Sequence, residues 1–220
     1  MEHKRNNKRI TMKIVQIAIL SAIATILYLP IFSFPLPFLF PGFLELQFSN
    51  LPAIIGGFAV GHVGGCLIII IKTILKLFFA GTNTAYVGEF ADIIIGVMVV
   101  LTTSLLYKQK KTKKRAALSL GIGSFLWVVV SIIANWIVLV PFYIELFMNG
   151  DINVFVGACS IIPGINENNY MSMYLIFGAG LFNLMLSILT SLITFFVYKR
   201  ISVLFDKMEE YIIIENSEII

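Results

Sequence analysis

The sequence predicts an all-α integral membrane protein with six transmembrane helices, and three observations support this prediction. Of the 220 residues, 59% are hydrophobic and only 13% are charged, whereas a soluble domain carries about 25% charged residues. Apolar runs recur along the chain, and about 20 such residues cross a bilayer as a helix. The basic residues gather in three clusters between or beside these runs, as they do in cytoplasmic loops.

The first predicted span covers residues 12–29 and stops at Pro30. The next segment, 31–47, contains three prolines, which exclude a regular helix because proline lacks a backbone N–H. The segment is also too apolar for an ordinary solvated loop. We therefore expect it to fold back onto the protein or to lie at the membrane interface.

The second predicted span, 48–60, is short, and the third, 63–79, follows after almost no loop. A helix of about 13 residues is roughly 20 Å long. It does not cross a hydrocarbon core of about 30 Å by itself. We expect the second span to be buried against its neighbours or to lie below the proline-rich segment.

The fourth predicted span covers 87–107, and the fifth, 117–147, is long enough to tilt or to kink near Pro141. A long loop then leads to the sixth span, 173–197, and a short tail with acidic residues ends the chain. The spans divide the chain into three parts. These are a basic N-terminus (1–11), a six-helix membrane domain (12–202) and a C-terminal tail (203–220).

Six spans place both termini on one side of the membrane, and all three basic clusters then fall on that side. The clusters cover residues 4–13, 108–115 and 199–207. The predicted outer segments contain no Lys or Arg: 31–47, 80–86 and 148–171. Because cytoplasmic loops hold an excess of Lys and Arg, the N- and C-termini and the loop after the fourth span are predicted to be cytoplasmic.

Four charged residues interrupt the apolar runs of the third and fourth spans. Lys72 and Lys76 are four residues apart, and Glu89 and Asp92 are three apart, so each pair shares a helical face. A charge at the bilayer centre costs about 2.5–3.5 kcal/mol, which favours pairing between the lysines and the carboxylates. Such pairs act as a clamp between two helices, as the edge of a solute cavity open to the outside, or as a proton relay.

Two amide side chains, Asn135 and Asn183, lie in the apolar fifth and sixth spans. A carboxamide both donates and accepts hydrogen bonds, so each residue either joins two helices or contacts a ligand. Together with Tyr86, Trp136 and Phe182 they fit a pocket for a flat heteroaromatic ligand. The rings would hold its plane, and the amides would read its polar edge.

The sequence lacks the motifs that are typical of several other functions. The P-loop pattern that cradles nucleotide phosphates is absent, and so is the H-E-x-x-H zinc motif. With only two histidines and no Cys/His cluster, the sequence predicts no metal site. The net charge of +4 is explained by the cytoplasmic clusters, so no nucleic-acid partner is expected.

Three stretches carry a family resemblance: "FLELQFSNLPAIIGGFAVGHVGG", "IKTILKLFFAG" and "VGEFADIIIG". They resemble the substrate-binding S components of energy-coupling-factor (ECF) vitamin transporters, especially the riboflavin-specific ones, and the similarity extends through all six spans. The resemblance implies a six-helix S-component fold in the bacterial cell membrane that captures riboflavin near the extracellular face. It also implies a module with a coupling transmembrane subunit and two ATPase subunits, and riboflavin as transported ligand rather than a bound cofactor.

The resemblance also implies roles for individual residues. Asn135 and Asn183 match the family's contacts to the flavin ring. The outer loop and the start of the fourth span match further ligand contacts: Leu44, Glu45, Gln47, Ala85, Tyr86 and Glu89. The Ala18-xxx-Ala22 pair on the first span is similar to the small-residue motif by which S components dock on the coupling subunit.

Two positions depart from the family pattern. Asn50 stands where the family usually has Asp, and Leu186 stands where it often has Lys. A missing lysine removes a contact to the ligand, for which Lys76 is a candidate substitute. The alternatives are therefore an S component for a different vitamin or precursor, a structural membrane subunit, and an integral-membrane enzyme with Glu89 and Asp92 as acid and base.

Overall fold

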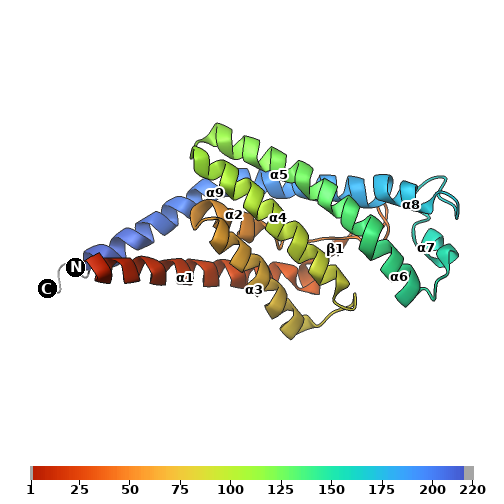
Figure 1. The fold of residues 1–220 in the computed structure, drawn as a ribbon, viewed down its shortest axis with the longest axis horizontal. Helices are drawn as coiled ribbons and strands as arrows, with labels where there is room; N and C mark the ends of the chain where they lie inside the picture. Colours follow the sequence, from red (N-terminus) through yellow and green to blue (C-terminus); the bar gives the residue numbers. More distant parts are fainter. Residues whose placement is uncertain (1, 216–220) are drawn as a thin grey trace.

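Long helices run along one elongated bundle, in which α1 begins and α9 ends at the same end (Figure 1). The structure, a computed structural model, describes residues 2–215. The long helices are α1 (Glu2–Tyr28), α3 (His62–Ala80), α4 (Val87–Gln109), α5 (Lys113–Ala134) and α9 (Leu181–Glu215). The shorter helices are α2 (Leu51–Ala59), α6 (Val140–Phe147), α7 (Ile152–Ala158) and α8 (Tyr170–Met173).

Among the described residues, five helical stretches are long and apolar enough to cross a membrane. They are Lys8–Tyr28, His62–Ala80, Val87–Gln109, Lys113–Phe147 and Tyr170–Phe205. The second predicted span is not one of them, because α2 has only 9 residues. Its residues from Pro52 to Phe58 are all buried, so α2 is a short inner helix enclosed by its neighbours.

Close packing of α2 against α3 explains a glycine in each helix. A Cβ on Gly65 would lie 2.8 Å from the carbonyl oxygen of Ala53 and 2.9 Å from the Cα of Gly57. The turn between the helices uses Gly61, whose φ of +111° is readily adopted only by glycine. The "GGFAVGHVGG" stretch therefore permits a tight hairpin between a buried helix and a membrane-length one.

Two π-helical turns interrupt the last two long helical stretches. The turn η2 (Asn135–Leu139) joins α5 to α6, and η3 (Tyr174–Gly180) joins α8 to α9. In η2 the N–H of Val140 donates to the carbonyl of Asn135, directly before Pro141. Such π turns occur frequently at functional sites, and here each contains or adjoins a polar residue of the cavity described below.

The proline-rich segment folds back onto the bundle, which was one of the two predicted arrangements. After a single turn, η1 (Pro30–Phe32), β1 (Phe34–Pro35) pairs antiparallel with β2 (Glu45–Leu46), with Phe34 opposite Leu46. This short ladder is a departure from the all-α prediction. Between the strands, buried Phe40 packs edge-on against Phe182 of α9, with ring centroids 5.3 Å apart.

The predicted part boundaries fall inside helices. Helix α1 already begins at Glu2, so residues 2–11 continue the first span as a helix. Helix α9 continues to Glu215, so most of the predicted 203–220 tail is helical, and its last five residues lie outside the described range. The polar and charged residues at the start of α1 and at the end of α9 extend these helices, because Lys, Arg, Glu and Met are strong helix formers.

Candidate functional site

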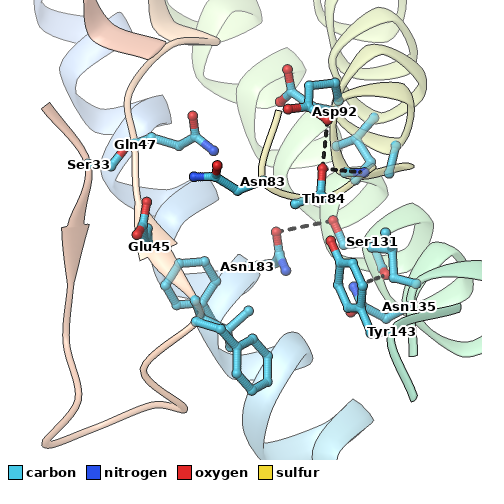
Figure 2. A pocket seen from close by; sticks show the side chains of 18 of the residues that line it. Ser33, Glu45, Gln47, Asn83, Thr84, Asp92, Ser131, Asn135, Tyr143 and Asn183 are labelled. Carbon is cyan, nitrogen blue, oxygen red and sulfur yellow. Dashed lines mark hydrogen bonds between the residues drawn. The ribbon is translucent and has the colours of Figure 1, made fainter. Parts of the chain in front are cut away.

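A cavity of about 550 Å³ opens between the proline-rich segment and the ends of α4, α5 and α9 (Figure 2). Its volume lies within the range of about 300–1,000 Å³ found for small-molecule sites. Six of the eight predicted ligand contacts line it: Leu44, Glu45, Gln47, Glu89, Asn135 and Asn183. Residues that are far apart in the sequence thus line the same cavity.

Ala85 and Tyr86 are not among the lining residues. Both have left-handed backbone angles, with φ of 47° and 69°, in the turn before α4, and Tyr86 is 64% exposed. Asn83 and Thr84 of the same turn line the cavity instead (Figure 2). The predicted turn is therefore at the cavity, and the two residues that line it precede Ala85 and Tyr86.

Lys72 lies at the centre of a fully bonded network on α3. Its ammonium donates to Ser49 Oγ at 2.7 Å, to Asn50 Oδ1 at 2.7 Å and to Asp92 Oδ2 at 2.9 Å. It also lies 4.4 Å from the ring centroid of Tyr28, within the range of a cation–π contact. The side chain is 0% exposed. Each of the three N–H groups of this buried cation therefore needs a protein acceptor, and each has one.

Lys76 and Glu89 form the second ion pair, at 2.5 Å. Lys76 also donates to the carbonyl of Gly81 at 2.9 Å. The other carboxylate oxygen of Glu89 accepts hydrogen bonds from Thr82 at 2.9 Å and Thr84 at 2.6 Å. Glu89 lies in the first turn of α4, where the helix dipole favours a negative charge, and both members of the pair line the cavity.

Asn183 joins α9 to α5 and still presents one unused donor. Its side-chain oxygen accepts from Trp127 Nε1 at 3.1 Å and from Ser131 Oγ at 3.2 Å (Figure 2). Its amide donates to the carbonyl of Ala179 at 2.9 Å. An amide has two N–H groups, so one remains available to a molecule in the cavity.

Asn135 is buried in the first position of η2. Its amide donates to the carbonyl of Ser131 at 2.9 Å, and its oxygen accepts from the hydroxyl of Tyr174 at 3.1 Å. This residue therefore links the two π turns, and both partners line the cavity. Like Asn183, it has protein partners for its oxygen and for one of its N–H groups.

The aromatic lining differs from the prediction. Trp136 is 57% exposed and Tyr86 is also exposed, whereas Phe182 lines the cavity as predicted. The tryptophan at the site is Trp127, which is 4% exposed. Trp127, Ser131 and Asn135 follow one another at intervals of four residues, so the helical spacing was a signal that could have identified Trp127.

Three rings from different segments close one end of the cavity. Phe43 of the proline-rich segment lies 6.1 Å from Phe155 of α7 and 5.9 Å from Tyr174, and Phe155 lies 5.1 Å from Tyr174, between ring centroids. All three residues line the cavity. The long loop after α6 therefore supplies a wall of the site through Phe155, which sequence reasoning missed.

The loop that carries Phe155 is itself packed. Phe155 and Cys159 are 1% and 0% exposed, and the Asp151 side chain caps α7 by accepting from the N–H of Asn153. Burial raises the pKa of the Cys159 thiol to about 12. The thiol is therefore protonated at neutral pH and a poor nucleophile.

The two departures from the family pattern both lie at the site. Asn50 bridges the buried pair, because its oxygen accepts from Lys72 and its amide donates to Asp92 at 3.1 Å. A carboxylate in this position could not donate to Asp92. Leu186 lines the cavity and is 5% exposed, three residues after Asn183 on α9.

The predicted docking residues lie on the outer face of α1. Ala18 and Ala22 are exposed, whereas Leu20 and Ala24 are buried against the bundle. Among the residues with described side chains, no group of three or more His, Cys, Asp or Glu is placed to hold a metal ion.

Comparison with known proteins identifies the family. The model of the ECF transporter substrate-specific component matches residues 12–198. The chain is 29% identical over 199 residues to the riboflavin transporter RibU of Staphylococcus aureus, covering 90% of this chain and 95% of that protein. It is 33% identical over 132 residues to the riboflavin transporter FmnP of Bacillus subtilis, covering 60% of this chain and 68% of that protein.

A solved structure, described as "Structure and mechanism of the S component of a bacterial ECF transporter", superposes with a TM-score of 0.63 at 28% sequence identity. The match covers 93% of this chain and 98% of the solved one. The family consists of transporter components rather than enzymes, and its model spans most of the chain. The chain therefore belongs to the substrate-specific components of ECF transporters.

Proposed function

We propose that this chain is the riboflavin-binding S component of a bacterial ECF importer. The observation that carries the proposal is a cavity of about 550 Å³ lined by aromatic rings and by two amides with spare donors. Riboflavin presents a flat tricyclic ring with a carbonyl-rich edge, which such a lining suits. Several relatives are named riboflavin transporters.

In the proposed complex, Asn135 and Asn183 donate their remaining N–H groups to the ring edge. Glu45 and Gln47 of the proline-rich segment contact the ligand from the opposite side (Figure 2), and Leu44 of the same segment also lines the cavity. The oxygen of Gln47 is buried without a hydrogen-bond partner, so a ligand hydroxyl or N–H would satisfy it. Glu89 and Lys76 form the polar edge of the same space.

The proposed topology counts α2 as a short sixth span and places both termini on the cytoplasmic side of the bacterial cell membrane. The basic N-terminus 1–11, the loop 108–115 and the tail 203–220 then face the cytoplasm. Introduced cysteines at 110–114 and 150–155 test this in a Cys66→Ala background, since native Cys159 is buried. External labelling at 110–114 in intact cells would contradict the topology.

We further propose that uptake requires a coupling transmembrane subunit and two ATPases, with Ala18 and Ala22 as the docking face. Small exposed side chains let another helix approach closely. Ala18→Trp should abolish transport but leave riboflavin binding by the isolated chain intact. If Ala18→Trp lost riboflavin binding but still assembled with the coupling subunit, this face would belong to the ligand site and not to the docking surface.

Leu186 favours a second candidate function, an S component for a different vitamin or precursor. This residue lines the cavity at the position where the family often has Lys, so one polar contact to the ligand is replaced by an apolar one. Such a change preserves the fold and the coupling but alters which ligand is best accommodated.

The absorption spectrum of the purified protein separates these candidates. A co-purified flavin with its yellow absorption would support the riboflavin proposal. Absence of flavin, together with failure of added riboflavin to bind, would overturn it and leave the second candidate, which a screen of other vitamins by thermal stabilisation would then test.

A further inference from the structure

A second cavity lies at the other end of the bundle and shares no lining residue with the first. Its volume is about 400 Å³. It is bounded by α1, by the hairpin between α2 and α3, and by the end of α4, which lie near one another in Figure 1. The proposed vitamin site does not use this space.

The lining of the second cavity is basic. Lys13 comes from α1, Lys108 from α4 and Lys111 from the loop after α4, and His62 opens α3. Among the residues whose side chains the structure describes, no Asp or Glu lines this cavity. Within the part of the chain whose side chains are described, none of the three lysines forms an ion pair. Three exposed lysines that line one cavity, without a described counter-charge, favour an anionic occupant.

The start of α3 adds backbone donors to the same wall. Gly61 is its N-cap and provides no side chain to accept from the first-turn N–H groups. Gly61, His62 and Val63 all line the cavity. The first N–H groups of a helix have no intrahelical partner, although the C-terminal ends of α2 and α4 line the same cavity and offset the dipole of α3. These donors supplement the lysines.

An apolar track leads away from this cavity along α3. Val63 lines the cavity and is 62% exposed, and Leu67, Ile70 and Ile74 continue on the same helical face with exposures of 41%, 40% and 60%. A free phosphate would make no use of this track, whereas acyl chains would lie along it. The combination favours a phospholipid over a soluble anion.

We propose that the second cavity binds the phosphate-bearing headgroup of an anionic phospholipid, with the acyl chains along α3. Lys13, Lys108 and Lys111 contact the phosphate, and the first turn of α3 donates to it. Basic pockets between helices on the cytoplasmic side bind such headgroups in other membrane proteins. This site is independent of the identity of the transported vitamin.

Native mass spectrometry of the full chain, released from detergent, tests the proposal with dioctanoyl phosphatidylglycerol as the probe. The test variant is Lys108→Gln with Lys111→Gln, and the matched control is Lys110→Gln with Lys114→Gln. The control removes the same charge from exposed positions that do not line the cavity. Thermal unfolding of each variant establishes that it is folded.

Each lysine near an anionic headgroup contributes roughly fivefold in affinity, so the test variant should bind phosphatidylglycerol about 25-fold more weakly. The control should stay within about threefold of the unmodified chain. Lys108→Arg with Lys111→Arg should retain binding, because the charge is preserved. Dioctanoyl phosphatidylcholine should bind more weakly than phosphatidylglycerol.

Equal weakening in the test and control variants would overturn the proposal, because it would indicate only general surface attraction. Unchanged binding in the test variant would also overturn it. Competition by inorganic phosphate at concentrations similar to those of the lipid would overturn the assignment to a phospholipid, since the acyl chains would then contribute nothing.

Discussion

The two polar walls of the large cavity use hydrogen bonding differently. Behind the α3–α4 wall, every N–H of the enclosed Lys72 ammonium has a protein acceptor, and on the wall each carboxylate oxygen of Glu89 and Asp92 has a protein donor. On the α5–α9 wall, Asn135 and Asn183 each retain one N–H beyond those bonded within the protein. Lys72, Glu89 and Asp92 are internally satisfied, whereas the two amides have donors left for a ligand. Lys76, which lines the cavity, also keeps one donor, because its three N–H groups have two protein acceptors.

This difference assigns separate roles to the two walls. A buried cation with all its donors engaged cannot contact a ligand without losing a bond, and an unpaired buried charge is strongly destabilising. The charged wall therefore fixes the position of α3 relative to α4. Spare hydrogen-bonding capacity at the cavity surface marks the residues that read the ligand.

The largest effect is expected at the centre of the charged wall. Lys72→Met leaves Asp92, which is only 15% exposed, without its cation and removes a donor from Ser49 and Asn50. Breaking a buried pair in this way costs about 3–5 kcal/mol, which denaturant titration of the purified protein in detergent would measure. Lys114→Met, at an exposed position, should change the unfolding free energy by less than about 0.5 kcal/mol. Similar unfolding free energies for Lys72→Met and Lys114→Met would show that the Lys72 network does not stabilise the fold.

Lys76→Met should have a smaller effect on the same wall. Glu89 keeps its bonds from Thr82 and Thr84 and stays at the helix N-terminus, so the expected loss is about 1–3 kcal/mol. The same titration measures it, with Lys72→Met as the reference. A loss larger than that of Lys72→Met would show that the pair lining the cavity, rather than the enclosed one, holds α3 to α4.

Asn135→Leu should produce the smallest change of the three in stability, about 1–2 kcal/mol, because it removes the acceptor of one tyrosine hydroxyl and one backbone bond. Tyr174→Phe removes the same side-chain link from the other side. A double-mutant cycle between the two should therefore give a coupling energy of about 1 kcal/mol. Strict additivity would mean that the bond between η2 and η3 contributes nothing.

Much of the architecture could be predicted from the sequence because long apolar runs and a one-sided charge distribution are local properties. The lysine–carboxylate pairs followed from spacing and from the cost of unpaired charge. Ser49 and Asn50 could not be anticipated as partners of Lys72, because they precede a short helix whose burial depends on the packing of the whole bundle.

The site was less predictable for the same physical reason. Phe43 and Phe155 meet across two loops that are distant in the chain, and no periodic pattern links them. The choice of Trp136 over Trp127 ignored the four-residue spacing that places Trp127 on the face of Asn135. The turn before α4 was located correctly, but its left-handed backbone at Ala85 and Tyr86 was not visible in the sequence.

Riboflavin titration of Asn183→Leu beside Lys72→Met, followed by quenching of flavin fluorescence, tests the division of roles most directly. Both variants are measured under conditions in which they remain folded. Loss of one hydrogen bond in a buried site costs about 1–3 kcal/mol, so Asn183→Leu should raise the Kd of riboflavin at least about tenfold. Lys72→Met should leave the Kd within about threefold of the unmodified protein. An unchanged Kd for Asn183→Leu together with a tenfold increase for Lys72→Met would contradict the account.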